Sequence, residues 1–154
     1  MGTSPGRFVY GTIALGALLA AESARQETYA KTIAAVAVTI VLYWLALSYS
    51  EFAGDRLGGG EPFRIAGFVT AAKRELGVLS GALVPFVVLL VWGAVGATLT
   101  AAVAAASWTC AIVIVATEVA IGTRAGLEGR ELVTQTGCGV LLGLLVVALR
   151  ILLH

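Results

Sequence analysis

The chain has 154 residues, of which 59% are hydrophobic and only 12% are charged, with a mean hydropathy of +0.97. Soluble domains carry about 25% charged residues, and a water-soluble fold of this size cannot bury so much apolar surface. The composition therefore predicts an integral membrane protein. The net charge of +1 argues against a nucleic-acid partner, because such partners are bound by strongly basic surfaces.

Five apolar segments alternate with short polar ones. A membrane-spanning helix needs about 20 apolar residues, and the expected spans are residues 8–24, 30–53, 76–98, 100–122 and 134–153. The third and fourth form one run that is too long for a single span, so we expect the chain to fold back near residues 97–101. The predicted fold class is all-α, an integral membrane helix bundle of five transmembrane helices in a single domain over residues 1–154.

The first apolar segment has a second interpretation. Arg7 precedes an apolar core that ends in small residues near Ala21, and this pattern is also typical of a signal peptide. Because another hydrophobic segment follows closely, we favour a retained span. If the segment is cleaved or re-entrant, the bundle has four transmembrane helices.

The loop between the second and third spans contains the main extramembrane element. Pro62 suits the first turn of a helix, and the residues that follow predict a short amphipathic helix over about 62–75. Its apolar face consists of Ile65, Phe68, Val69, Ala72 and Leu76, and its basic residues are Arg64, Lys73 and Arg74. We expect this helix to lie on the inner leaflet, with a solvated linker as the alternative.

The arginines and lysines predict an orientation, because cytoplasmic loops carry an excess of them. Most of them lie before the first span, in the second loop and in the fourth loop. We therefore expect a cytoplasmic N-terminus and an outside C-terminus. The preference for arginine over lysine, with abundant Ala, Gly and Val, indicates a GC-rich bacterial genome and hence a bacterial inner (plasma) membrane.

Polar residues within the spans are the candidate functional residues. They are Thr39 and Tyr43 on the second span and Ser107 and Glu118 on the fourth. Small and hydroxyl side chains favour close helix packing, which is the interpretation we prefer. The alternative is a water- or ion-accessible path, in which Glu118 is the best anchor, although pairing of Glu118 with Arg124 explains it equally well.

Two further residues predict a link between the first and the last span. In the expected topology, Glu22 on the first span and Arg150 on the fifth both end near the outer boundary. They form a candidate ion pair that ties these helices together. The alternative is that each side chain reaches to water separately.

Catalytic and metal-binding patterns are missing from the sequence. Its single histidine is the last residue, its single aspartate is Asp55 in a loop, and Cys110 and Cys138 lie in apolar runs without a paired spacing. Without a histidine or a membrane lysine to activate a hydroxyl or a thiol, we expect no enzyme, no cofactor and no metal site.

Three runs of the chain resemble a known group of proteins. Residues 9–13, 43–49 and 143–154 are similar to small uncharacterised integral membrane proteins of high-GC bacteria. The resemblance covers most of the chain and implies a membrane helix bundle. It implies no activity.

Two functions remain open at this point. The first is a non-catalytic membrane scaffold or interaction protein, with another membrane protein, a second copy or lipid as its partner. The second is a small oligomeric channel or transporter for protons, cations or a small solute. Glu118 distinguishes them, because a hydrated cavity at this residue favours transport, whereas capping by Arg124 or contact with a lipid headgroup favours a scaffold.

Overall fold

The computed structural model describes residues 5–23, 28–59 and 64–152 of the chain. The regular structure of this part is entirely α-helical, which confirms the predicted fold class. The helices are α1 (Pro5–Ser23), α2 (Tyr29–Gly59), α3 (Ile65–Arg74), α4 (Leu76–Ala94), α5 (Leu99–Arg124) and α6 (Gly129–Leu152).

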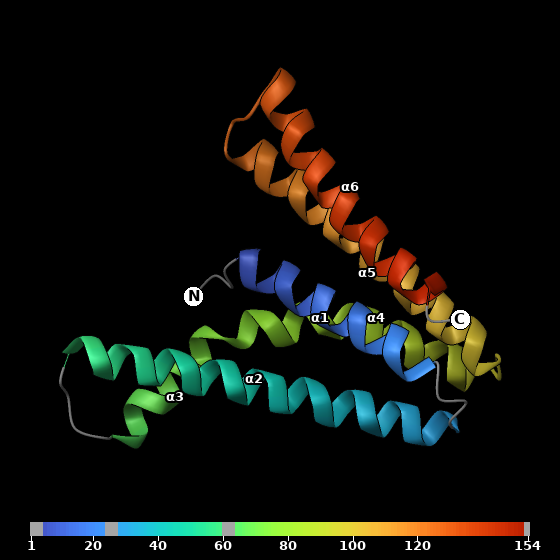
Figure 1. Ribbon diagram of the computed structural model, residues 1–154, viewed down its shortest axis with the longest axis horizontal. Coiled ribbons are helices and arrows are strands. Elements are labelled where there is room, and N and C mark those ends of the chain that lie inside the picture. The colour runs from blue at the N-terminus through green and yellow to red at the C-terminus, as the bar shows by residue number, and fades with distance from the viewer. Residues whose placement is uncertain (1–4, 24–27, 60–63, 153–154) are drawn as a thin grey trace.

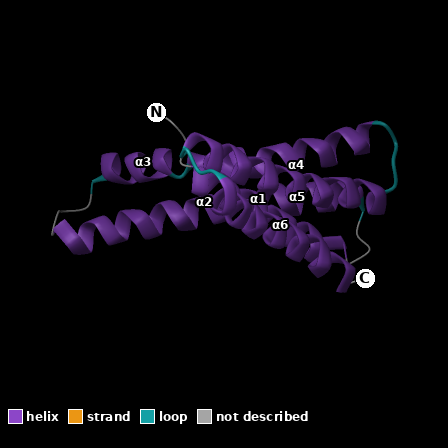
Figure 2. Cartoon of the chain, turned by 90° about the horizontal axis from the view of Figure 1, so that it is seen from above, coloured by secondary structure: helices purple, strands orange, loops and turns teal. Residues whose placement is uncertain are grey.

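Four of these helices are long and apolar enough to cross a membrane. They are α4, α5, α6 and the part of α2 between Tyr29 and Asp55. The apolar stretch of α1, Pro5–Ala21, is shorter. Successive apolar helices run in opposite directions (Figure 1), and α3 lies beside α2 at the end of the bundle away from the α4–α5 turn (Figure 2). The chain is therefore a membrane-spanning helix bundle.

The chain folds back between α4 and α5 slightly before the predicted position. Gly96 adopts a φ of 79° in this turn, a left-handed conformation that glycine adopts at little cost. Thr98 caps α5, because its Oγ1 accepts a hydrogen bond from the backbone N–H of Ala101 at 3.3 Å.

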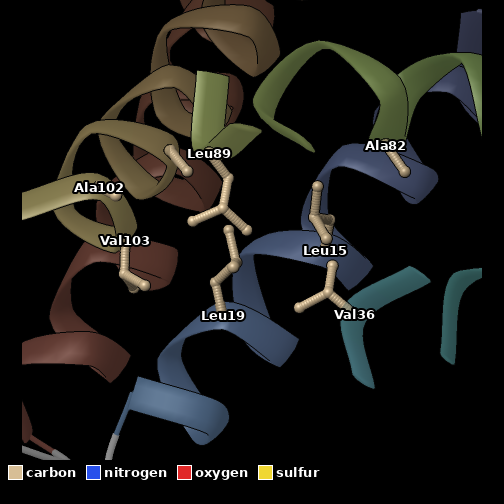
Figure 3. Close-up of a cluster of buried hydrophobic side chains, with 8 residues drawn as sticks. Leu15, Leu19, Val36, Ala82, Leu89, Ala102 and Val103 are labelled. Carbon is tan, nitrogen blue, oxygen red and sulfur yellow. The ribbon is translucent and has the colours of Figure 1, made fainter. Parts of the chain in front are cut away.

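Helix α1 lies at the centre of the bundle and packs on α2, α4, α5 and α6. Its Leu15 and Leu19 are fully buried, and Figure 3 shows them pointing toward Val36 of α2 and Leu89 of α4. Ala102 and Val103 of α5 complete this core. The segment with the weakest sequence signal for a span is thus the helix on which the others assemble.

The crossing of α1 and α4 is closer than ordinary side chains allow. A Cβ atom on Gly11 would overlap the carbonyl oxygen of Val78, and one on Gly81 would overlap the carbonyl oxygen of Phe8. Each glycine therefore faces the backbone of the opposite helix. Small residues at helix interfaces permit such backbone contact in membranes.

A buried hydrogen bond stabilises the same crossing. Pro85 lies inside α4 and has no N–H to donate to the carbonyl of Gly81, four residues earlier. The Thr12 hydroxyl of α1, which is fully buried, donates to this carbonyl at 2.9 Å. Pro85 alone would leave this carbonyl without a donor in α4. A side chain from another helix supplies the missing hydrogen bond.

Helices α5 and α6 form a hairpin that diverges from α1, α2 and α4 toward its turn (Figure 1). Gly139 packs on the Glu118 side chain, and Gly143 packs on Ala111. The glycine pair of α6 therefore provides contact within the chain.

Candidate functional site: an arginine–glutamate cluster and an adjoining cavity

Charged side chains from four parts of the chain meet at the end of the bundle where α1 begins. Arg7 comes from α1, Glu51 and Asp55 come from α2, Arg74 ends α3, and Glu75 joins α3 to α4. We call these five residues the arginine–glutamate cluster. It contains three carboxyl groups and two guanidinium groups.

Arg7 is the central cation of the cluster. Its Nε lies 2.8 Å from Oε1 of Glu75, and its Nη2 lies 3.1 Å from Oε2 of Glu51. Its Nη1 donates to the backbone carbonyl of Arg74 at 3.1 Å. A single guanidinium thus connects α1 to α2 and to the α3–α4 junction, because its donors are spread over three nitrogens, whereas those of lysine share one nitrogen.

Arg74 makes the second set of ion pairs. Its Nη1 lies 3.3 Å from both Oε1 of Glu51 and Oδ2 of Asp55. The Arg74 side chain is 53% exposed and that of Asp55 is 65% exposed, so this pair is well solvated and contributes little to stability. The less exposed part of the cluster is the group formed by Arg7, Glu51 and Glu75, of which only Glu75 is buried.

Glu75 is the most buried charged residue of the cluster, with 6% of its surface exposed. Burial raises the pKa of Glu75 to about 7, the hydrogen bond with Glu51 adds to the rise, and the charge of Arg7 opposes it. Desolvation and a neighbouring carboxyl group both disfavour the ionised form. Glu75 therefore changes protonation near neutral pH.

Helix α3 is attached to α2 next to the cluster. The indole N–H of Trp44 donates to the carbonyl of Ala72 at 3.1 Å. The rings of Phe52 and Phe68 pack edge to face with centroids 6.0 Å apart. Glu75, at the C-cap of α3, lies at one end of this α2–α3 contact.

A cavity of about 240 Å³ lies between α1, α2 and α4. Its lining is mostly apolar, with the Thr39 and Tyr43 side chains of α2 as its hydroxyl groups. The lining residues Gly11 and Val78 lie four and three residues after Arg7 and Glu75, which is about one helical turn. The cluster therefore adjoins one end of the cavity.

The four predicted polar residues fall in three places. Thr39 and Tyr43 line the cavity, and the Tyr43 hydroxyl contacts the hydroxyl of Tyr10, on which its ring is stacked. Ser107 is buried in α5 and donates to the carbonyl of Val103 at 2.8 Å. Glu118 accepts a hydrogen bond from Gln135 of α6 at 3.1 Å, so its observed partner is Gln135.

The remaining predicted residues lie at both ends of the bundle. Arg150 donates to the carbonyl of Thr100 at 3.1 Å, while the side chain of Glu22 lies outside the described residues, so their pairing stays a prediction. On α3, Arg64 and Lys73 are exposed, and Arg74 belongs to the cluster.

The cluster is not apparent as a site from the sequence. The orientation predicted from the basic residues places Arg7 and Arg74 on one side, and Glu51, Asp55 and Glu75 adjoin the same ends of their segments. Acidic and basic residues at the same side of the membrane were the feature of the sequence that could have predicted a cluster. Which of these charges would be buried depends on the packing of α1 against α4, which no local pattern specifies.

Over residues 5–23, 28–59 and 64–152, no three His, Cys, Asp or Glu side chains are grouped so as to hold a metal ion. No protein-family model matches the chain, and no curated protein or solved structure shows significant similarity to it. The function must therefore be argued from the site and the surface.

Proposed function

We propose that this chain is a non-catalytic scaffold of a bacterial plasma membrane that binds another integral membrane protein. The observation that carries the proposal is a groove of about 390 Å³ on the α5–α6 hairpin. Its floor contains Ala111 and Gly143, and its walls include the exposed side chains of Trp108, Ile112 and Leu144. Small residues between large ones can accept the side chains of a partner helix, and aromatic residues are frequent at such contacts.

The use of the polar groups in α5 and α6 supports a binding role. Ser107 is bonded within its own helix, and Glu118 is capped by Gln135 and packs on Gly139. These groups already serve contacts within the chain. The partner of Glu118 is Gln135 and not the expected Arg124, but a carboxylate bonded to α6 and packed on Gly139 is used for helix contact, which supports a scaffold.

We further propose that the N-terminus and the arginine–glutamate cluster face the cytoplasm. The positive-inside rule supports this orientation. It places α3 at the inner leaflet, with the exposed Ile65 and Val69 toward the acyl chains and Arg64 and Lys73 near the headgroups.

The scaffold proposal is tested by photocrosslinking in native membranes. A photoreactive amino acid replaces Ile112 in the groove, and a matched variant carries it at Val38, which is exposed on α2. We expect a discrete protein adduct from position 112 and only lipid adducts from position 38. Mass spectrometry of the adduct distinguishes a second copy of the chain from a different protein. Lipid adducts alone at position 112 contradict the proposal.

A second candidate function is transport, and the cavity between α1, α2 and α4 favours it. Thr39 and Tyr43 both line this cavity, whereas Glu118 is held by α6. A conducting protein should therefore lose proton or cation flux in liposomes on Tyr43→Phe or Thr39→Val, and keep it on Glu118→Gln. Flux equal to that of empty liposomes, from a folded protein, removes this candidate.

A further inference from the structure

We propose that Glu51, Glu75 and Arg7 form a proton-operated latch that holds the α3–α4 junction against α1 and α2. With one proton shared by the two carboxyl groups the latch is closed, and loss of this proton to water loosens the contact between α2 and α3.

The closed latch is the arrangement that the structure shows. Arg7 contacts Glu75 at 2.8 Å, Glu51 at 3.1 Å and the carbonyl of Arg74 at 3.1 Å. Because both carboxyl groups contact the same guanidinium, Glu51 and Glu75 lie close together around Arg7. Two carboxyl groups can share a hydrogen bond only if one of them carries a proton. In the closed latch one proton is therefore held between Glu51 and Glu75, and Arg7 balances the remaining negative charge.

Loss of the proton changes the charge balance. The groups that face Glu75 are Arg7 of α1 and Glu51 of α2, while Arg74 of α3 faces Glu51 and Asp55. The ionised cluster has three negative and two positive charges, and Glu75 is its least exposed member. A buried anion next to a second carboxylate is unfavourable. Separation of Glu75 from Glu51 relieves this repulsion and admits water.

The separation acts directly on α3. Glu51 belongs to α2, and Glu75 directly follows Arg74, the last residue of α3. Repulsion between the two carboxylates therefore opposes the contacts that attach α3 to α2, including the bond from Trp44 to Ala72. Since Glu75 titrates at about pH 7, small changes of pH around neutrality switch the position of α3.

The latch is independent of the scaffold proposal. It concerns the end of α2 and α3, whereas the proposed docking groove lies on α5 and α6. Crosslinking at Ile112 can therefore fail while the latch is intact, and the latch can fail while the groove still binds a partner.

Trp44 provides a local reporter for the test. The other two tryptophans of the chain, Trp92 and Trp108, are exposed and can be replaced by phenylalanine. The full-length protein in liposomes is then titrated from pH 5 to pH 9, with Trp44 emission as the signal and helix content measured by circular dichroism. We expect a reversible shift of the emission with a midpoint near pH 7 and unchanged helix content.

Three variants separate the latch from other causes of pH dependence. Glu75→Gln mimics the protonated group and should keep the low-pH emission throughout the titration. Glu51→Gln removes the repelling charge and should move the midpoint to lower pH. Asp55→Asn is the matched control, because it removes an exposed carboxylate that contacts Arg74, and it should leave the midpoint unchanged.

Infrared difference spectra provide a second readout that does not depend on Trp44. A protonated carboxyl band should disappear over the same pH range in the wild type and should be missing in Glu75→Gln. The proposal is overturned if the emission shift persists in Glu75→Gln, if Asp55→Asn moves the midpoint as much as Glu51→Gln does, or if the folded wild type shows no transition.

Discussion

Helices α1 and α2 differ in a way that their hydropathy does not predict. The apolar stretch of α1 is the shorter of the two, yet α1 is surrounded by four other helices. The apolar stretch of α2, Tyr29–Asp55, is longer, but only 11% of its 18-residue apolar window is buried within the protein. A long apolar stretch thus indicates that a helix can face lipid. Burial of a helix within the bundle depends on small and hydroxyl residues, such as Gly11, Thr12 and Gly16 of α1.

The physical reason is the solvent. Lipid tails are as apolar as leucine, so in the bilayer core the hydrophobic effect does not favour contact with another helix over contact with lipid. Close backbone packing and hydrogen bonds therefore decide which helix becomes the centre. Helix α1 provides both toward α4, while much of α2 presents valine and leucine side chains outward.

The strongest way to break this contrast is to add a methyl group at the α1–α4 crossing. Gly11→Ala would place Cβ on the carbonyl oxygen of Val78, and backbone cannot move aside as a flexible side chain can. We expect a loss of about 3 kcal/mol in the free energy of unfolding, measured by SDS titration in mixed micelles. Gly54→Ala is the control, since its Cβ would meet nothing within 4 Å, and it should gain up to about 1 kcal/mol from helix propensity. Equal effects at both positions would contradict the central role of α1.

The second prediction concerns the cluster that links α1 to α2. Glu75 has a folded-state pKa of about 7, above the value of 4.5 expected for an unfolded chain. Folding therefore favours the protonated group, and the resulting stabilisation is complete below pH 4.5 and is lost as the pH rises through 7. The stability difference between wild type and Glu75→Gln, measured from pH 4 to pH 8, should consequently turn against the wild type as the pH rises. A difference that is constant with pH excludes this titration.

A smaller effect is expected at the hydroxyl group of the crossing. Thr12→Val keeps the shape of the side chain but leaves the carbonyl of Gly81 without the donor that replaces the N–H of Pro85. We expect a loss of about 1 kcal/mol. Thr70→Val should have almost no effect, because Thr70 is exposed and bonds within its own helix. If Pro85→Ala restores the stability of Thr12→Val, the compensation by Thr12 is established; if it does not, the compensation is wrong.

The smallest effects are expected on the outer face of α2. Val38→Ala should change the free energy of unfolding by less than about 0.5 kcal/mol, because Val38 is 57% exposed and exchanges its contacts with lipid. Val36→Ala, two residues earlier and fully buried in the core, should cost about 1–2 kcal/mol. Equal losses of stability at Val36 and Val38 would show that the two faces of α2 do not differ in their packing.

Much of the architecture was predictable because it depends on local properties. Apolar runs of the right length predict helices in a membrane, and the length of the run over residues 76–122 required a turn, which Gly96 provides. Gly139 and Gly143 are four residues apart, a spacing typical of close helix packing in membranes, and both contact α5. The helix over residues 62–75 was expected from its amphipathic pattern, and α3 occupies most of this range.

The candidate site was predictable only in part. The polar pattern singled out Thr39 and Tyr43, which line one cavity, but it grouped them with Glu118, which is bonded to α6. Helical periodicity gives the face on which a residue lies. It does not give the helix that the face will meet, so residues on similar faces were assigned to one path.

The all-α membrane bundle follows from the amino-acid sequence alone. The length of the apolar runs matches the thickness of a bilayer, and the backbone of a spanning segment satisfies its hydrogen bonds within a helix. The packing of the helices is needed to know which helix is central, which carboxyl group is buried and which carbonyl accepts the hydrogen bond of Thr12. These features arise from contacts between residues that are distant in the chain, such as Arg7 with Glu75 and Thr12 with Gly81. Their energies depend on distances of a few ångströms that form only when the helices pack.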